Sequence, residues 1–205
     1  VRHDFKDVNR NELLEDPVKR RKMIGDMVDE LDDRMLRESC IYQMLNRFKP
    51  DIIIDCINTA TGIAYQNIYS SYQDVLKITD NKKKKDYDAL QNGVEKLICT
   101  SYVPQLIRHV QILYNSMVKF NTMYYFKVGT SGTGGMGLNI PFTHSEEKPS
   151  RVLLSKSSVA GAHTLLLFLM ARTPNGPSIK EIKPTAAIAW KRITYGDIKK
   201  GGKPI

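Results

Sequence analysis

The sequence has few of the residues that hold small secreted or metal-binding proteins together. It contains three cysteines, which lie far apart in the chain: Cys40, Cys56 and Cys99. An odd number of scattered cysteines does not form a disulfide framework, and the four histidines belong to no CxxC- or HExxH-type metal motif. We therefore expect a cytoplasmic protein of a reducing compartment that binds no metal.

A long hydrophobic run is also missing. The most apolar stretch, Thr164–Ala171, is much shorter than the about 20 residues that a membrane-spanning helix needs. The first residues do not resemble a signal peptide, and they read as the interior of a longer chain. These features favour a protein without a membrane partner, and they predict a domain that is incomplete at its N-terminus.

The remaining composition is typical of a globular domain. Hydrophobic residues make up 41% and charged residues 26%, and 205 residues are enough for one domain with a sizeable core. The formal net charge of +9 suits an anionic partner such as a nucleotide, a nucleic acid or a membrane surface. The basic run Lys82–Lys85 has only Tyr87 as an aromatic neighbour, so it favours a solvated loop over a nucleic-acid site.

Strand-like and helix-like patterns alternate along the chain. Helical spacing runs from residue 11 to Lys49, with a break near Asp16 and a stop at Pro50. Further helices are expected over residues 65–78 and 89–99, after Ser101 and over 151–172, and strands over 1–5, 51–57, 123–128, 178–183 and 186–190. This alternation predicts an α/β domain with a mainly parallel sheet. Residues 51–57 include few polar side chains, which predicts a central strand covered on both faces.

Small polar residues follow two of these strands. Asn58–Thr61 comes after the strand at 51–57, and Gly129–Gly132 comes after the strand at 123–128. Ligands of open parallel sheets bind beyond the carboxyl ends of the strands, so both segments are candidate binding loops. Lys156 is the lone charged residue between Val152 and Met170, which indicates that it faces a site rather than solvent.

Three short motifs occur in a family-like order. They are INTA at Ile57–Ala60, KVGTS at Lys127–Ser131 and VLLSK at Val152–Lys156. INTA resembles the NNAG-type turn of the short-chain dehydrogenase/reductase superfamily, KVGTS resembles the strand end that carries its catalytic serine, and VLLSK aligns with its YxxSK motif. The opening VRHDFKDV resembles the third strand of that family, and the resemblance extends to about Trp190.

The resemblance implies a Rossmann-like three-layer domain with a mainly parallel sheet over residues 1–192, followed by the start of a C-terminal extension or tail at 193–205. It implies an NAD(P)-dependent oxidoreductase that acts on a carbonyl or alcohol substrate. The partners would be NAD or NADP and a small-molecule substrate, and the protein would be able to form a homo-oligomer.

The same resemblance assigns roles to individual residues. Lys156 would hold the nicotinamide ribose, and Ser131 or Thr133 would polarise the substrate carbonyl. The residues expected to contact the cofactor are Asn58, Thr59, Ala60, Lys156 and Asp4, the last of them beside the adenine.

Two departures from the family pattern leave a second interpretation open. The tyrosine of YxxSK is replaced by Val152, which carries no proton. Either another group supplies the acid, for which Thr143, His144 and Tyr65 are candidates, or no redox chemistry occurs. A GxGxxG match at Gly132–Gly137 precedes an extended LNIPF segment instead of a helix, so it does not predict a phosphate-binding loop. The alternative is a non-catalytic nucleotide-binding or regulatory module.

Three other residues are predicted to have ordinary structural roles. Arg108 and His109 lie off the apolar stripe of their helix, so we expect them on the surface. His163 lies in the most apolar helix, and we expect a core histidine whose hydrogen bonds are satisfied.

Overall fold

The computed structural model describes residues 2–80, 86–129, 151–182, 199–200 and 203–204. The helices within them are η1 (His3–Phe5), α1 (Arg10–Glu15), α2 (Pro17–Val28), α3 (Asp33–Glu38), α4 (Cys40–Phe48), α5 (Thr59–Ala64), α6 (Ile68–Asp80), α7 (Tyr87–Cys99), α8 (Tyr102–Lys119) and α9 (Arg151–Ala171). The strands are β1 (Ile52–Asp55), β2 (Tyr124–Val128), β3 (Ser178–Ile182), β4 (Lys199–Lys200) and β5 (Lys203–Pro204). The strand expected at 186–190 and the run Lys82–Lys85 lie outside the described residues.

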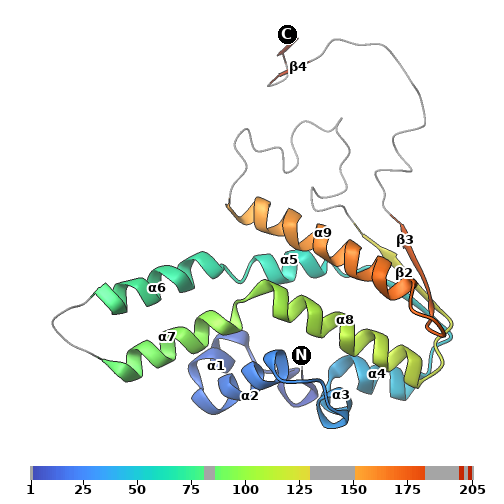
Figure 1. The fold of residues 1–205 in the computed structure, drawn as a ribbon, viewed down its shortest axis with the longest axis horizontal. Helices are drawn as coiled ribbons and strands as arrows, with labels where there is room; N and C mark the ends of the chain where they lie inside the picture. Colours follow the sequence, from blue (N-terminus) through green and yellow to red (C-terminus); the bar gives the residue numbers. More distant parts are fainter. Residues whose placement is uncertain (1, 81–85, 130–150, 183–198, 201–202, 205) are drawn as a thin grey trace.

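The larger of the two described sheets contains β1, β2 and β3. All three are parallel and lie in the order β1-β2-β3, with Tyr125 opposite both Ile53 and Ile179. The chain passes from β1 to β2 through α5–α8, and α9 precedes β3 (Figure 1). The predicted α/β class, the parallel sheet and three of the predicted strands are therefore confirmed.

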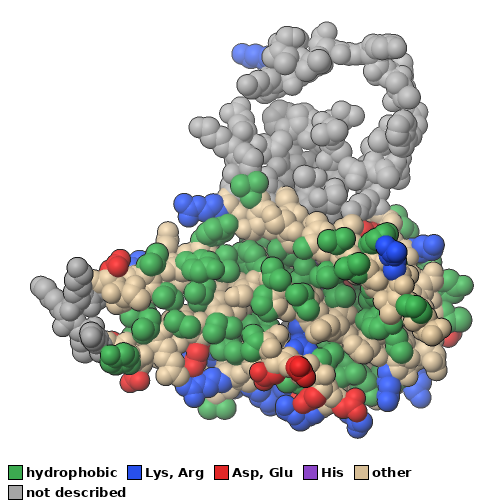
Figure 2. All heavy atoms as spheres, viewed as in Figure 1, with side chains coloured by type: hydrophobic (Ala, Val, Ile, Leu, Met, Phe, Trp, Pro, Cys, Tyr) green, Lys and Arg blue, Asp and Glu red, His purple; other side chains and the backbone are tan. Residues whose placement is uncertain are grey.

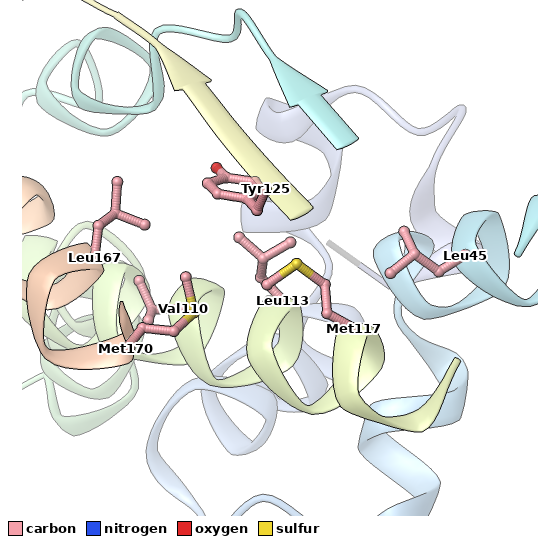
Figure 3. Packing of buried hydrophobic residues seen from close by; sticks show 7 residues of the cluster. All are labelled: Leu45, Val110, Leu113, Met117, Tyr125, Leu167 and Met170. Carbon is pink, nitrogen blue, oxygen red and sulfur yellow. The ribbon is translucent and has the colours of Figure 1, made fainter. Parts of the chain in front are cut away.

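Helices α4, α8 and α9 cover one face of this sheet. Tyr125, at the centre of β2, is fully buried among side chains from these three helices (Figure 3). The buried cluster consists of Leu45, Val110, Leu113, Met117, Tyr125, Leu167 and Met170. Ile53 and Ile179 pack against it from the flanking strands. Alternate residues of a strand share a face, so this face is the one that carries the core.

The described residues leave much of the opposite face of the sheet exposed. Ile52 is 52% exposed, Ile54 is 67% exposed and Tyr124 is 43% exposed. The rings of Tyr124 and Phe126 stack on this face with centroids 6.3 Å apart. Residues 51–57 were expected to form a central strand covered on both faces. This was wrong within the described part of the chain, because β1 is an edge strand of the sheet and β2 lies at the centre. Its run of isoleucines reflects strand propensity as much as burial.

The N-terminal helices form a charged layer beside α7 and α8. The predicted break near Asp16 is confirmed, because its carboxylate accepts hydrogen bonds from the N–H groups of Val18 and Lys19 and so caps α2. The expected strand at residues 1–5 was wrong, since His3–Phe5 is a 3₁₀ helix and Arg2 forms only an isolated bridge to Ser39. Five residues are too few to show a clear hydrophobic period, so this segment gave a weak prediction. Charged side chains gather over these helices at the bottom of Figure 2.

Helix α9 carries apolar side chains on its exposed side as well as on its buried side. By length and composition alone, Leu154–Ala171 is the one described stretch that meets the requirements of a membrane span. A core helix of a soluble protein passes the same test, and α9 packs against α5, α8 and β3. Val159, Ala160 and Leu167 are buried in these contacts. Several apolar side chains of the same helix are exposed: Leu154, Leu165, Phe168 and Leu169.

The core beneath β2 can be tested with two methionines that differ in burial. Met117 is fully buried and Met44 is 51% exposed. Met117→Ala is expected to lower the free energy of unfolding by about 2–5 kcal/mol, because it removes buried methylenes and leaves a cavity. Met44→Ala is expected to change it by less than about 0.5 kcal/mol. Urea denaturation of the three proteins measures both changes, and equal losses would contradict the placement of the core.

Candidate functional site

The carboxyl ends of the three strands meet α5 and α9 around a small cavity. Its volume is about 30 Å³, roughly the share of one water molecule. The cavity is lined by Ile57, Asn58, Thr59, Ala60, Lys127, Gly129, Ala160, His163, Thr164 and Glu181. The small side chains Ala60 and Ala160 let α5 and α9 approach closely, and both are buried. This edge of the sheet is where open parallel sheets bind their ligands.

A buried ion pair holds β1 and β2 together at this edge. The Oδ2 atom of Asp55 accepts hydrogen bonds from the Tyr125 hydroxyl at 2.6 Å and from Lys127 Nζ at 2.9 Å. Lys127 Nζ also donates to the carbonyl oxygen of Ile57 at 2.5 Å, and Ile57 N–H donates to Asp55 Oδ1 at 2.8 Å. Only 6% of the Lys127 side chain and 12% of the Asp55 side chain are exposed. The short link after β1 is therefore fixed from both sides.

These contacts also set the protonation of the cluster. Burial by itself raises the pKa of the Asp55 carboxyl, but the hydrogen bonds from Tyr125 and Lys127 outweigh burial and hold that pKa below its usual value. Burial, and next the hydrogen bond to Asp55, raise the pKa of the Tyr125 phenol. At neutral pH Asp55 is thus a carboxylate, while Tyr125 keeps its proton and acts as a hydrogen-bond donor.

One histidine lines the cavity, and a second contacts the first from α8. His163 of α9 is buried and lines it, and the ring of His109 from α8 meets the His163 ring edge-on with centroids 5.8 Å apart. Burial, and next the nearby His163, lower the pKa of His109 to about 4. Burial, and next the Lys127 ammonium, lower the pKa of His163. Both imidazoles are therefore neutral at pH 7, and the Nε2 atom of each lacks a hydrogen-bond partner in the described structure.

Three predictions about ordinary residues change as a result. His163 is buried, as expected. We also expected all its hydrogen bonds to be satisfied, and this was wrong, because its Nε2 atom has no partner among the described residues. The expected surface positions of Arg108 and His109 were wrong, because Arg108 is 8% exposed and His109 packs against α9. The apolar stripe of α8 marks only one of its contacting sides, since α2, α4, α5 and α9 all touch this helix.

The structure brings the first group of predicted cofactor residues to the cavity. Asn58 caps α5, and its Oδ1 accepts a hydrogen bond from the N–H of Thr61 at 3.0 Å. Thr59 is the first residue of α5, and Ala60 is buried against Val159 and its neighbours in α9. Asn58, Thr59 and Ala60 all line the strand-end cavity.

The other predicted site residues have different positions. Lys156 is buried on α9, one helical turn before the cavity residue Ala160. Asp4 is bonded to Arg2 and Lys22 in the N-terminal helices, and it does not line the strand-end cavity. Its predicted place followed from the strand at residues 1–5, which is not formed.

Several predicted residues lie outside the described part of the chain. These are Ser131, Thr133, Thr143, His144 and the glycines of Gly132–Gly137. Tyr65 is described, and it is 65% exposed at the end of α5, away from the cavity lining.

The sequence analysis did not assign to a site the polar residues that hydrogen-bond to one another at this edge or line its cavity. Asp55, Tyr125, Lys127 and His163 carry its hydrogen bonds and its buried polar atoms. One signal was available, because Tyr125 and Lys127 are two residues apart in a strand and so lie on the same face. A lysine on the buried face of a strand indicates a buried acidic partner.

The described residues contain no group of three or more His, Cys, Asp or Glu side chains placed to hold a metal ion. The chain matches no protein family, no curated protein and no solved structure at the level of significance that we required.

The ion pair of Asp55 can be tested by its effect on acid stability. Because its pKa is depressed in the folded state, its contribution is present above the unfolded-state pKa of about 4 and is lost as the pH falls through the lower folded-state pKa. Asp55→Asn is expected to lower the free energy of unfolding by about 3 kcal/mol at pH 7, since it leaves Lys127 buried without its partner.

The same variant should flatten the dependence of stability on pH below about pH 4. Asp74→Asn is the control, because Asp74 is exposed and its ion pair within the described ranges is to the exposed Lys77. Urea denaturation between pH 2 and 7 measures both effects. An Asp55→Asn curve parallel to that of the wild type would contradict the role of this carboxylate.

Proposed function

We propose that the chain contains a Rossmann-like domain of an NAD(P)-dependent oxidoreductase of short-chain dehydrogenase type. Three consecutive parallel strands in the order β1-β2-β3 correspond to one half of a doubly wound sheet. In such sheets the dinucleotide binds beyond the carboxyl ends of the strands. The strand order and the family-like motifs therefore support the same placement of the ligand.

The observation that carries the proposal is the convergence of three separate segments at one edge. Asn58 comes from the link after β1, Gly129 from the end of β2, and His163 from α9. Lys156 lies one helical turn before Ala160, which lines the same cavity. An amide and an imidazole from segments far apart in the sequence thus line one cavity, and the Lys156 ammonium belongs to the next turn of α9, which supports the proposal of a shared ligand.

The chemistry of these groups suits the nicotinamide end of the cofactor, which would bind at the mouth of the cavity, because a volume of about 30 Å³ holds no more than a water molecule. A carboxamide and ribose hydroxyls need hydrogen-bonding partners, which Asn58 and Lys156 supply, and the unpartnered Nε2 of His163 is a buried polar atom of the same cavity. When bound, the cofactor supplies hydride transfer. The chain's own residues bind and orient the ligand, and the neutral His163 imidazole holds or accepts a proton. Ser131 or Thr133 would polarise the substrate carbonyl.

Lys156 gives the direct test of this proposal. Lys156→Ala is expected to weaken NADPH binding by about tenfold or more, because it removes a charge-assisted hydrogen bond to the ribose. It is also expected to lower NADPH-dependent turnover of carbonyl substrates. Fluorescence titration with NADPH and NADH measures affinity, and Lys77→Ala, an exposed lysine of α6, is the control. Unchanged affinity and turnover in Lys156→Ala would rule the assignment out.

Val152 favours a second candidate function, that of a non-catalytic nucleotide-binding module. It lies in the first turn of α9, and Lys156 follows one turn later on the same side of the helix. A valine at this position donates no proton, so a module that binds a nucleotide without redox chemistry would tolerate it.

Introducing a tyrosine at position 152 distinguishes the two functions. In Val152→Tyr, the Lys156 ammonium one turn away would lower the phenol pKa and support proton transfer. For an oxidoreductase we expect NADPH-dependent turnover to rise at least about tenfold, and Val152→Phe, which lacks the hydroxyl, to show no rise. NADPH binding by Val152→Tyr without any turnover would favour the non-catalytic module.

A further inference from the structure

A second cavity lies among the N-terminal helices and shares no lining residue with the cavity at the strand ends. Its volume is about 390 Å³, within the about 300–1,000 Å³ range of small-molecule sites. The apolar part of its wall comes from η1, α1, α2, α3 and α8, and includes Phe5, Leu13, Met23, Met27, Met35 and Ile112. Methionine side chains are flexible, so this wall can adapt to different apolar shapes.

Arg108 of α8 brings an unbalanced positive charge to the wall of this cavity. Its side chain is 8% exposed, and its Nη2 atom donates to the carbonyl oxygen of Asp29. Its Nε and Nη1 atoms are buried and meet no acceptor in the described structure. A buried guanidinium is normally paired with a carboxylate or phosphate, so the two unpaired N–H groups indicate an anionic ligand.

The other charged groups at the cavity do not neutralise Arg108. Arg2 is saturated by three carboxylates, one of which is Asp26, the acidic residue of the wall. Arg10 donates to the side-chain oxygen of Gln66 and to a backbone carbonyl, so its described partners carry no charge. Counted over the lining residues alone, Arg2, Lys6, Arg10 and Arg108 are positive and Asp26 is negative, so the wall has an excess of positive charge.

His109 adds a second polar group next to Arg108. It lines the same cavity, and its buried Nε2 atom lacks a hydrogen-bond partner within the described ranges. With a pKa of about 4, its imidazole is neutral at pH 7. It can therefore hydrogen-bond to a ligand oxygen without bringing a second charge to the cavity.

We propose that this cavity binds an amphipathic monocarboxylate, a small molecule with one carboxylate and an aliphatic or aromatic body. The carboxylate would accept a hydrogen bond from Nε or from Nη1 of Arg108, the two buried donors that lie on different edges of the planar guanidinium. The body would lie against the methionines and Leu13. A neutral apolar ligand would leave the guanidinium unpaired, so the charge of the ligand contributes to affinity as well as its apolar area.

The experiment compares two ligands with the same chain length and different heads. Isothermal titration calorimetry of the 205-residue protein with octanoate and with 1-octanol measures the contribution of the carboxylate. Octanoate is expected to bind at least about tenfold more tightly than 1-octanol, because only octanoate satisfies the buried guanidinium.

Three variants locate the site. Arg108→Met is expected to weaken octanoate binding by about tenfold or more while leaving 1-octanol binding unchanged. Its Tm should not fall, because the substitution removes a buried charge that the described protein does not neutralise. Met27→Phe narrows the apolar wall and should weaken both ligands. Arg47→Met, which removes an exposed arginine outside the cavity lining, is the matched control and should bind both ligands like the wild type.

Three results would overturn the proposal. The first is octanoate binding that is absent or no tighter than 1-octanol binding. The second is unchanged octanoate affinity in Arg108→Met. The third is an Arg108→Met protein with a lowered Tm that has lost both ligands, which would make Arg108 a structural residue that stabilises the chain near Asp29. None of these outcomes bears on dinucleotide binding at the strand ends, because the two cavities have no residue in common.

Discussion

The carboxylate of Asp55 makes the contacts on which the carboxyl ends of β1 and β2 depend. One of its oxygens accepts hydrogen bonds from both Tyr125 and Lys127, so β1 and β2 are tied together where they end. Lys127 also holds the carbonyl of Ile57, which fixes the start of the link to α5. Tyr125 carries the same contact into the core, because its ring lies among the helices that cover the sheet (Figure 3). Charge pairing and apolar packing therefore fix the same strand ends.

Helix α8 connects the two cavities. Its apolar side chains Val110, Leu113 and Met117 pack under the sheet, while Arg108 and His109 line the cavity among the N-terminal helices. The His109 ring contacts His163, which lines the cavity at the strand ends. The cavity at Arg108 presents cationic and neutral donors that are suited to an anion, in keeping with the formal net charge of +9, whereas the wall of the cavity at the strand ends also contains Glu181. A single helix thus supports the core and supplies polar groups to two separate places.

Local patterns predicted the elements well where they were long or strongly periodic. The apolar stripe of α8 predicted a helix with one buried side, because hydrophobic periodicity records how a segment is buried. The isoleucine run of β1 predicted a strand but not its exposure, because it reflects strand propensity as well as burial. The same reasoning failed at residues 1–5, a segment too short to show a clear period, where His3–Phe5 forms a 3₁₀ helix. It also failed at Arg108 and His109, because a single stripe does not reveal that other helices cover the remaining sides of α8.

The sequence by itself determined the α/β class, the three parallel strands and the helical spacing of Val152 and Lys156, since these depend on neighbouring residues and on backbone preference. It did not predict α5, which Asn58 caps. Only the tertiary structure decided which charges and rings meet. Asp55 and Tyr125 are 70 residues apart in the chain, and His109 and His163 belong to different helices. Such pairs depend on strand register and helix packing, which no local pattern records. The site at the strand ends and the cavity at Arg108 both arise from those long-range contacts.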